Sequence, residues 1–242
     1  MQHNLKFIVT GTGRSGTVYT AKLLTQLGIP CGHECIFNYE TFDKIAFKLY
    51  DPKKRELSHC SVHDLSTIVE DPPETEKWVN SEETMAESSY MAAPYLKLPE
   101  LRDVKIIHVI RNPLKVVSSF IKSLNFFSQS TPTNEWEDKI YKNIKELNNI
   151  PNQIERACFY YCKWNELIEN NTKNNKYILC KLENIDNNQS FFDFIDKQKQ
   201  KITLPKNINI INKREEDIKM TDIPYGDIKN MFITKCGDYN YI

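Results

Sequence analysis

The sequence has no excess of charge of either sign and no long apolar run. Lysine and arginine together number 32 in a chain of 242 residues, as do aspartate and glutamate, so the net charge is zero. Without a global positive field we expect neither nucleic acid nor an anionic membrane as a partner, and any anion must be bound by local groups. No apolar run approaches the roughly 20 residues of a membrane-spanning helix, so we expect no membrane span.

The sequence also lacks the even number of cysteines that is typical of a disulfide-bonded protein. The seven cysteines are an odd number in a chain too large to need disulfide bonds for its stability, which favours reduced thiols and a cytoplasmic location. The apolar residues 5–9 are too few, with too weak a basic flank, to form a secretory signal. A chain of this length can form one sizeable α/β domain or two small ones, and we expect a single domain over residues 1–242.

A loop containing several glycines joins a strand pattern to a helix pattern near the start of the chain. Residues 5–10 are apolar and bounded by glycine, as in a buried parallel strand, and residues 18–27 carry leucines at helical spacing. The glycines permit close approach of the backbone, and Arg14 adds a permanent charge. The helix beginning near Thr17 offers free N–H groups and the positive end of its dipole, so the loop predicts a phosphate or sulfate site. The glycines are Gly11, Gly13 and Gly16.

The same glycines leave other interpretations open. The spacing Gly11-x-Gly13-x-x-Gly16 matches the dinucleotide fingerprint, and Glu34 follows at the spacing of a ribose-binding acid, which together would indicate an NAD(P)-dependent Rossmann oxidoreductase. A nucleoside-triphosphate loop is disfavoured because Thr17 stands where that motif has its lysine. An ordinary strand-to-helix turn without a ligand is a further alternative.

A second strand-to-helix turn repeats this plan. Residues 104–110 predict another buried strand, Arg111-Asn112-Pro113 follows at its end, and a helix is expected through residue 121. Proline is favoured at the first position of a helix, which fixes where this helix begins. Ser119 lies about two turns into the helix, so Arg111 and Ser119 can face one ligand.

The rest of the chain is consistent with alternating strands and helices. A short extended piece at residues 29–35 ends with His33 and Glu34, and carboxyl ends of strands are where open α/β sheets bind ligands. Further patterns predict a strand at 177–183 and helices at 38–50, 81–96, 135–147, 154–169, 189–199 and 225–233, the last followed by a tail at 236–239. Residues 125–134 are polar and begin a candidate acceptor-side lid at 125–150.

With both turns in place, the chain resembles the sulfotransferases that use 3′-phosphoadenosine 5′-phosphosulfate (PAPS), and it is identified as a member of that superfamily. Residues 13–17, Gly-Arg-Ser-Gly-Thr, are similar to the family's 5′-phosphosulfate loop. Arg111-Asn112-Pro113 with Ser119 is similar to its 3′-phosphate site. The resemblance implies a central parallel sheet flanked by helices in a P-loop NTPase-like sulfotransferase fold. It also implies transfer of a sulfuryl group from PAPS to a hydroxyl or amine, with release of adenosine 3′,5′-bisphosphate.

The resemblance also implies the residues that would bind the nucleotide. The residues expected at the 5′-phosphosulfate are Gly13, Arg14, Ser15, Gly16 and Thr17, those at the 3′-phosphate are Arg111 and Ser119, and late basic contacts would come from Lys213 and Arg214. Arg14 would in addition stabilise charge on the leaving phosphate and the sulfuryl oxygens.

The proton acceptor is expected in the segment Cys31-Gly32-His33-Glu34. This segment is similar to one in the tyrosylprotein sulfotransferase branch, which places Glu34 on the catalytic position and leaves His33 as the alternative base. Residues 31–35 and 59–63 contain cysteine and histidine, but at no established zinc spacing, so we expect no metal. The acceptor class remains open between a carbohydrate, a peptide tyrosine and a small molecule. A non-catalytic nucleotide-binding module is a third alternative.

Overall fold

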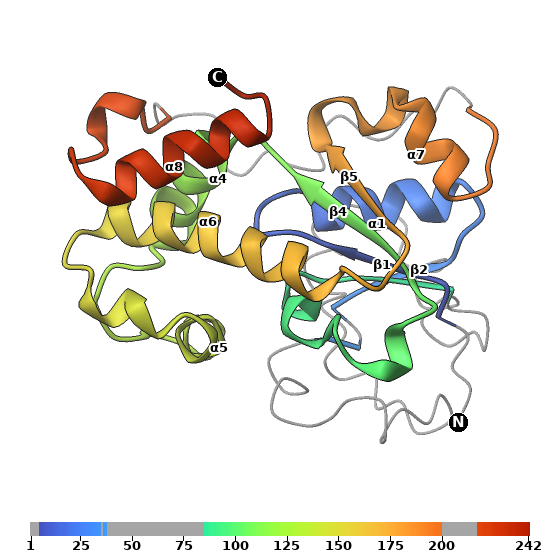
Figure 1. The fold of residues 1–242 in the computed structure, drawn as a ribbon, viewed down its shortest axis with the longest axis horizontal. Coiled ribbons are helices and arrows are strands. Elements are labelled where there is room, and N and C mark those ends of the chain that lie inside the picture. Colours follow the sequence, from blue (N-terminus) through green and yellow to red (C-terminus); the bar gives the residue numbers. More distant parts are fainter. Residues whose placement is uncertain (1–4, 35, 38–84, 200–216) are drawn as a thin grey trace.

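The computed structural model describes residues 5–34, 36–37, 85–199 and 217–242 of the chain. These residues form a five-stranded parallel sheet with the strand order β2-β3-β1-β4-β5 (Figure 1). The strands are β1 (Phe7–Thr10), β2 (Cys31–His33), β3 (Ala86–Ser88), β4 (Lys105–Ile110) and β5 (Tyr177–Lys181). An all-parallel sheet needs a helix layer on each face, because its connections cross over the sheet.

The helices that form these layers follow the strands along the chain. They are α1 (Thr17–Gln26), α4 (Pro113–Ser118), α5 (Glu135–Asn143), α6 (Gln153–Asn171), α7 (Gln189–Phe194) and α8 (Asp227–Asp238). Shorter turns are η4 (Tyr90–Tyr95), η5 (Pro99–Leu101), the π-helical η6 (Ser119–Ser123), η7 (Lys145–Asn149), η8 (Leu182–Asn187) and η9 (Met220–Asp222). In the described ranges, no helix is both long and apolar enough to cross a membrane.

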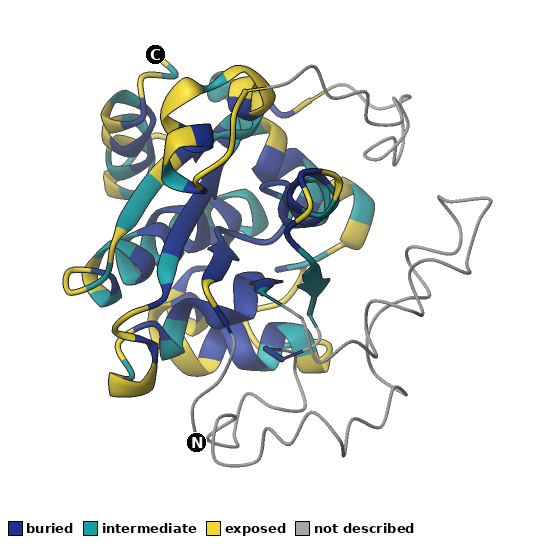
Figure 2. Cartoon of the chain, turned by 90° about the vertical axis from the view of Figure 1, so that its right-hand side faces the viewer, coloured by how far each residue is buried: buried dark blue, intermediate teal, exposed yellow. Residues whose placement is uncertain are grey.

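Two hydrophobic cores lie on opposite faces of the sheet. Successive strand residues alternate between them: Ile8 belongs to the core shared with α6 and α8, and Val9 to the core shared with α1 and α7. Figure 2 shows the central strands buried along their length, with exposed residues on the outer surfaces of the helices. Burial on both faces explains why the strand sequences are apolar at nearly every position rather than at alternate ones.

Most of the predicted elements are confirmed. The strands expected at 5–10, 104–110 and 177–183 correspond to β1, β4 and β5, and the helices expected at 18–27, 135–147 and 154–169 correspond to α1, α5 and α6. The helix expected at 189–199 is shorter than predicted, since α7 ends at Phe194. The helix predicted at 38–50 lies outside the described residues.

Two predictions of secondary structure are wrong. Residues 81–96 do not form one helix: within the described part they contain β3 and then the 3₁₀ turn η4, which includes Pro94. β3 is paired on both sides and completely buried, so ladder hydrogen bonds override the local helical pattern. The segment 236–239 is not a tail, because α8 continues to Asp238 and buries Cys236 in the core.

A buried histidine ties β4 to the helix layer formed by α6 and α8. His108 is completely buried, with Nδ1 at 2.8 Å from the Tyr177 hydroxyl and Nε2 at 2.8 Å from Asn165 Oδ1. Burial lowers the pKa of His108 to about 4; the Asn165 hydrogen bond and the Glu169 charge oppose that shift, and Lys235 adds to it. The imidazole is therefore neutral in the folded protein at neutral pH.

The histidine gives a pH dependence to stability. Its pKa is depressed on folding, so its contribution is complete above about pH 6.5 and is lost as the pH falls toward 4. Replacing His108 by glutamine keeps a neutral side chain that can hydrogen-bond. In urea unfolding at pH 7 and pH 5, we expect H108Q to reduce the loss of unfolding free energy between the two pH values by about 2 kcal/mol. Parallel pH profiles of the two proteins would contradict this assignment.

Candidate active site

The loop predicted to bind an anion connects β1 to α1 through residues 11–16. The backbone is left-handed at Arg14, with φ 65°, and at Gly16, with φ 108°, so the loop turns sharply before the helix begins. Ser15 closes the turn, because its hydroxyl donates to the Thr12 carbonyl at 2.6 Å. Among the described residues no side chain caps α1, so its first N–H groups and dipole can meet an anion.

Two glycines of the loop are required by close packing. A Cβ on Gly11 would lie 2.2 Å from the Val109 carbonyl oxygen of β4, which cannot move without breaking the sheet. A Cβ on Gly13 would lie 2.8 Å from the Phe120 ring. The Gly13 N–H also donates to the hydroxyl of buried Tyr160 at 3.1 Å, so α6 supports the loop from below.

The second turn follows β4 and is fixed by several hydrogen bonds. Asn112 caps α4, with its Oδ1 accepting from the Lys115 N–H at 3.2 Å, and Pro113 occupies the first helical position as expected. The Tyr161 hydroxyl donates to the Arg111 carbonyl at 3.4 Å. These contacts set the direction in which Arg111 leaves the sheet.

The two turns meet. Arg14 Nε donates to Ser119 Oγ at 2.9 Å, across 105 residues of sequence, and Arg111 Nη1 donates to the Arg14 carbonyl at 3.4 Å, across 97 residues. Ser119 begins the π-helical turn η6, a distortion often found at functional sites. The structure thus brings Arg14 of the first motif together with Arg111 and Ser119 of the second.

The two candidate bases lie beside the start of α1. His33 ends β2, and Glu34 follows with a left-handed backbone and its N–H bonded to the Ser88 carbonyl at 3.0 Å. His33 Nε2 lies 3.2 Å from Thr17 Oγ1 and 4.0 Å from Glu34 Oε1, and each of the two side chains is 12% exposed. The two candidate bases therefore lie next to the start of α1 and the loop that precedes it.

Burial determines the charge of His33. Desolvation, helped by the positive charge of Lys22, lowers the pKa of His33 to about 4, so the imidazole is neutral at pH 7. Burial also raises the pKa of Tyr90 well above its usual value, and the Glu34 carboxylate adds to that shift. The Glu34 carboxylate therefore lies close enough to Tyr90, the first residue of η4, to raise the pKa of its hydroxyl.

Some predicted residues cannot be placed, and one alternative loses support. Lys213 and Arg214 lie outside the described residues, as do Cys35 and residues 59–63. In the described ranges no three histidine, cysteine or carboxylate side chains gather as a metal site. The dinucleotide fold places its second strand beside the first, whereas here β3 lies between β1 and β2, which separates Glu34 from the ribose position that the Rossmann alternative requires.

Comparison with known proteins assigns the family. The family model described as a sulfotransferase domain matches residues 5–173, a range that contains both turns and both candidate bases. The chain belongs to this family. Its members transfer sulfuryl groups, so the chain is a sulfotransferase-type transferase with an acceptor of unknown class.

A solved structure is also similar to this sulfotransferase domain. A sulfotransferase from Alicyclobacillus acidocaldarius shares 12% identity over 84% of this chain and 87% of its own, with a TM-score of 0.40. No curated protein matches.

The structure also contains site residues that the sequence did not indicate. Tyr160 under the loop and Glu183 beside the second turn contact motif residues that are 147 and 71 positions away. Tyr160 sits in an aromatic helix face that is equally typical of a core. No local pattern marked its hydrogen bond to Gly13.

Gly11 provides a test of the loop geometry. We expect G11A to lower the unfolding free energy of the sulfotransferase domain by about 1–3 kcal/mol, because its Cβ would overlap the Val109 carbonyl. Gly237 in α8 is the matched control, since a Cβ there meets nothing within 4 Å, and G237A should stabilise by up to about 1 kcal/mol. Urea unfolding of both variants measures the difference. Equal stabilities would show that β1 and β4 tolerate a side chain at position 11.

Proposed function

We propose that this sulfotransferase moves a sulfuryl group from PAPS to a hydroxyl or amine acceptor and releases adenosine 3′,5′-bisphosphate. The observation that carries the proposal is the contact between Arg14 and Ser119, with Arg111 on the Arg14 carbonyl. Two permanent cations and a hydroxyl from separate strand ends gather at one edge of the sheet. A nucleotide with phosphate at both its 3′ and 5′ positions matches such a pair of neighbouring anion sites.

The nucleotide would lie across the two turns. The loop groups proposed for the 5′-phosphosulfate are Gly13, Arg14, Ser15, Gly16 and Thr17, those for the 3′-phosphate are Arg111 and Ser119, and Lys213 and Arg214 are proposed as later contacts. The uncapped start of α1 supports the first assignment, because helix N–H groups bind anionic oxygens directly. The fixed turn around Arg111 supports the second, because an ordered guanidinium loses little entropy on binding.

The chemistry would be an in-line displacement. PAPS supplies the sulfuryl group, which forms a bond to the acceptor oxygen or nitrogen as its bond to the phosphate oxygen breaks. Arg14 and the α1 N–H groups would stabilise the charge that builds on the phosphate and sulfuryl oxygens. The acceptor's proton would pass to Glu34, or to His33 as the alternative. None of these roles requires a metal.

Glu34 is the proposed base because of its surroundings. It lies directly after β2, is largely buried, and its backbone is held by Ser88 in β3. The neutral imidazole of His33 contacts Thr17, which suits a role in orienting the loop hydroxyl. A neutral imidazole could also take a proton, so the two roles must be separated by experiment.

Two further parts of the proposal concern the surroundings of the site. The segment 125–150 is proposed as an acceptor-side lid; Glu137 accepts hydrogen bonds from the N–H groups of Phe127 and Thr133, so residues 127–133 would move together with α5. A cytoplasmic location is proposed from the cysteines, because the five that the structure describes are free thiols.

Ligand-induced stabilisation tests the donor assignment. Adenosine 3′,5′-bisphosphate should raise the melting temperature, because a ligand that binds only the folded state stabilises it by about 2.7 kcal/mol at 100 times its Kd. NAD and ATP at the same concentration should give much smaller shifts, since neither carries a 3′-phosphate. Differential scanning fluorimetry provides the measurement. A selective response to NAD would replace the sulfotransferase mechanism with the oxidoreductase alternative.

Substitution of the candidate bases tests the catalytic assignment. We expect E34Q to lower kcat for PAPS turnover by about 10²–10⁴-fold while leaving bisphosphate binding nearly unchanged, because the amide keeps the shape but cannot accept the proton. H33Q is the matched variant and should lose about tenfold or less, since glutamine can still bond to Thr17. Unchanged turnover in E34Q, with a large loss in H33Q, would make His33 the base. Binding without turnover in the wild type would indicate a non-catalytic module.

A further inference from the structure

The Glu183 carboxylate connects three separate parts of the chain. Glu183 lies in η8, directly after β5, and its Oε1 accepts from the Asn112 N–H at 2.7 Å. Its Oε2 accepts from the Tyr241 hydroxyl, also at 2.7 Å. Both oxygens of one exposed side chain are therefore used, one for the turn after β4 and one for the segment after α8.

The bond to Asn112 extends the sheet beyond its last backbone pair. The β4–β5 register ends with Ile110 opposite Lys181. Asn112 and Glu183 each lie two residues farther, and there the side-chain carboxylate replaces the missing carbonyl partner. Pro113, the next residue, has no N–H, so the Asn112 bond is the last backbone donor contact before α4. Loss of the carboxylate would release the turn that carries Arg111.

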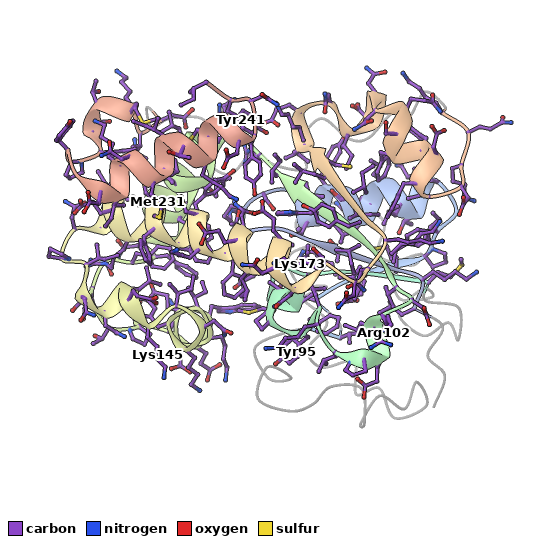
Figure 3. All side chains as sticks on the ribbon, in the orientation of Figure 1. Tyr95, Arg102, Lys145, Lys173, Met231 and Tyr241 are labelled. Carbon is purple, nitrogen blue, oxygen red and sulfur yellow. The ribbon has the colours of Figure 1, made fainter. Side chains whose placement is uncertain are left out.

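Tyr241 holds the carboxylate from the other side. Lys181 Nζ lies 4.6 Å from the Tyr241 ring centroid and donates to the Asn240 carbonyl at 2.9 Å. Burial, together with the Glu183 hydrogen bond, raises the pKa of Tyr241, whereas the positive charge of Arg111 acts in the opposite direction. The positive charge of Arg111 therefore acts on the Tyr241 hydroxyl. Tyr241 lies near the carboxyl ends of β4 and β5 (Figure 3).

We propose that Glu183 is a positioning residue for the 3′-phosphate site: it fixes the direction of Arg111 through Asn112, and Tyr241 fixes Glu183. The segment 240–242 then contributes to nucleotide affinity without touching the nucleotide. This inference rests on the proposed function, because it assigns the Arg111 turn to a 3′-phosphate.

A positioning role and a purely electrostatic role of Glu183 predict opposite results. A carboxylate close to a bound phosphate repels it, so removing the charge alone would strengthen binding. If the hydrogen bond to Asn112 matters more, E183A should weaken binding. E183Q separates the two effects, because its amide oxygen can still accept from Asn112 while the charge is gone.

The experiment measures Kd by calorimetry for adenosine 3′,5′-bisphosphate and for adenosine 5′-phosphate, which lacks the 3′-phosphate. We expect E183A to weaken bisphosphate binding about tenfold, as for one lost charge-assisted hydrogen bond, and Y241F about threefold. Binding of the 5′-phosphate should change by less than about twofold in both variants, and E183Q should remain within about threefold of wild type for both ligands. Asp103 provides the control, since it is exposed and lies two residues before β4, at the opposite end of that strand from the Arg111 turn.

Each result has a separate meaning. If wild type does not prefer the bisphosphate over the 5′-phosphate, the assignment of Arg111 to a 3′-phosphate fails. If wild type shows that preference but E183A binds like D103A, only the positioning role fails. Tighter binding by both E183A and E183Q, or equal weakening of both ligands in E183A, would likewise overturn the positioning role. The conservative Y241F variant tests the same link without removing a carboxylate.

Discussion

The site depends on a stagger between two neighbouring strands. Thr10, the last residue of β1, pairs with His108, and β4 continues for two residues beyond that pair to Ile110. The loop after β1 must therefore pass along the end of β4, and Gly11 makes this path available by lying against the Val109 carbonyl. The loop then reaches the level at which Arg111 leaves the sheet, where the guanidinium bonds to the Arg14 carbonyl. If β1 and β4 ended at the same level, the loop would not pass the Val109 carbonyl and Gly11 would not be needed there. The Arg14 carbonyl would then not lie where the Arg111 guanidinium reaches it.

The loop is supported by the aromatic core beneath it. The Phe120 ring contacts Tyr160 edge to face, with centroids 5.1 Å apart, and these two side chains meet Gly13 from below. Rigid aromatic packing beneath the loop helps to hold the left-handed backbone of Arg14, which is unfavourable for a residue with a side chain. Tyr161, the next residue of α6, donates to the Arg111 carbonyl, so one helix supports both turns.

The sequence predicted those features whose causes are local. β1 and β4 could be predicted because burial on both faces makes every position apolar, and the turns could be predicted because glycine, arginine and proline each mark a backbone or charge requirement. β3 could not, because it has only three residues and one of them is Glu87, a carboxylate that looks exposed in sequence but is completely buried and accepts from the Ile36 N–H at 2.9 Å. A buried carboxyl group that accepts from a distant backbone N–H leaves no local signature in the sequence. The bonds of Tyr160 and Glu183 were unpredictable for the same reason.

The neutral state of His33 bears on how the proposed base and the proposed donor site would work side by side. At 4.0 Å from Glu34, a protonated His33 would form an ion pair that holds the carboxylate charged and lowers its tendency to take a proton. Burial and Lys22 prevent this by lowering the pKa of His33 to about 4. At neutral pH the histidine therefore contributes a hydrogen bond to Thr17 rather than a charge next to Glu34. The positive charges near the site are then those of Arg14, Arg111 and Lys22, and the residue next to Glu34 in sequence carries none.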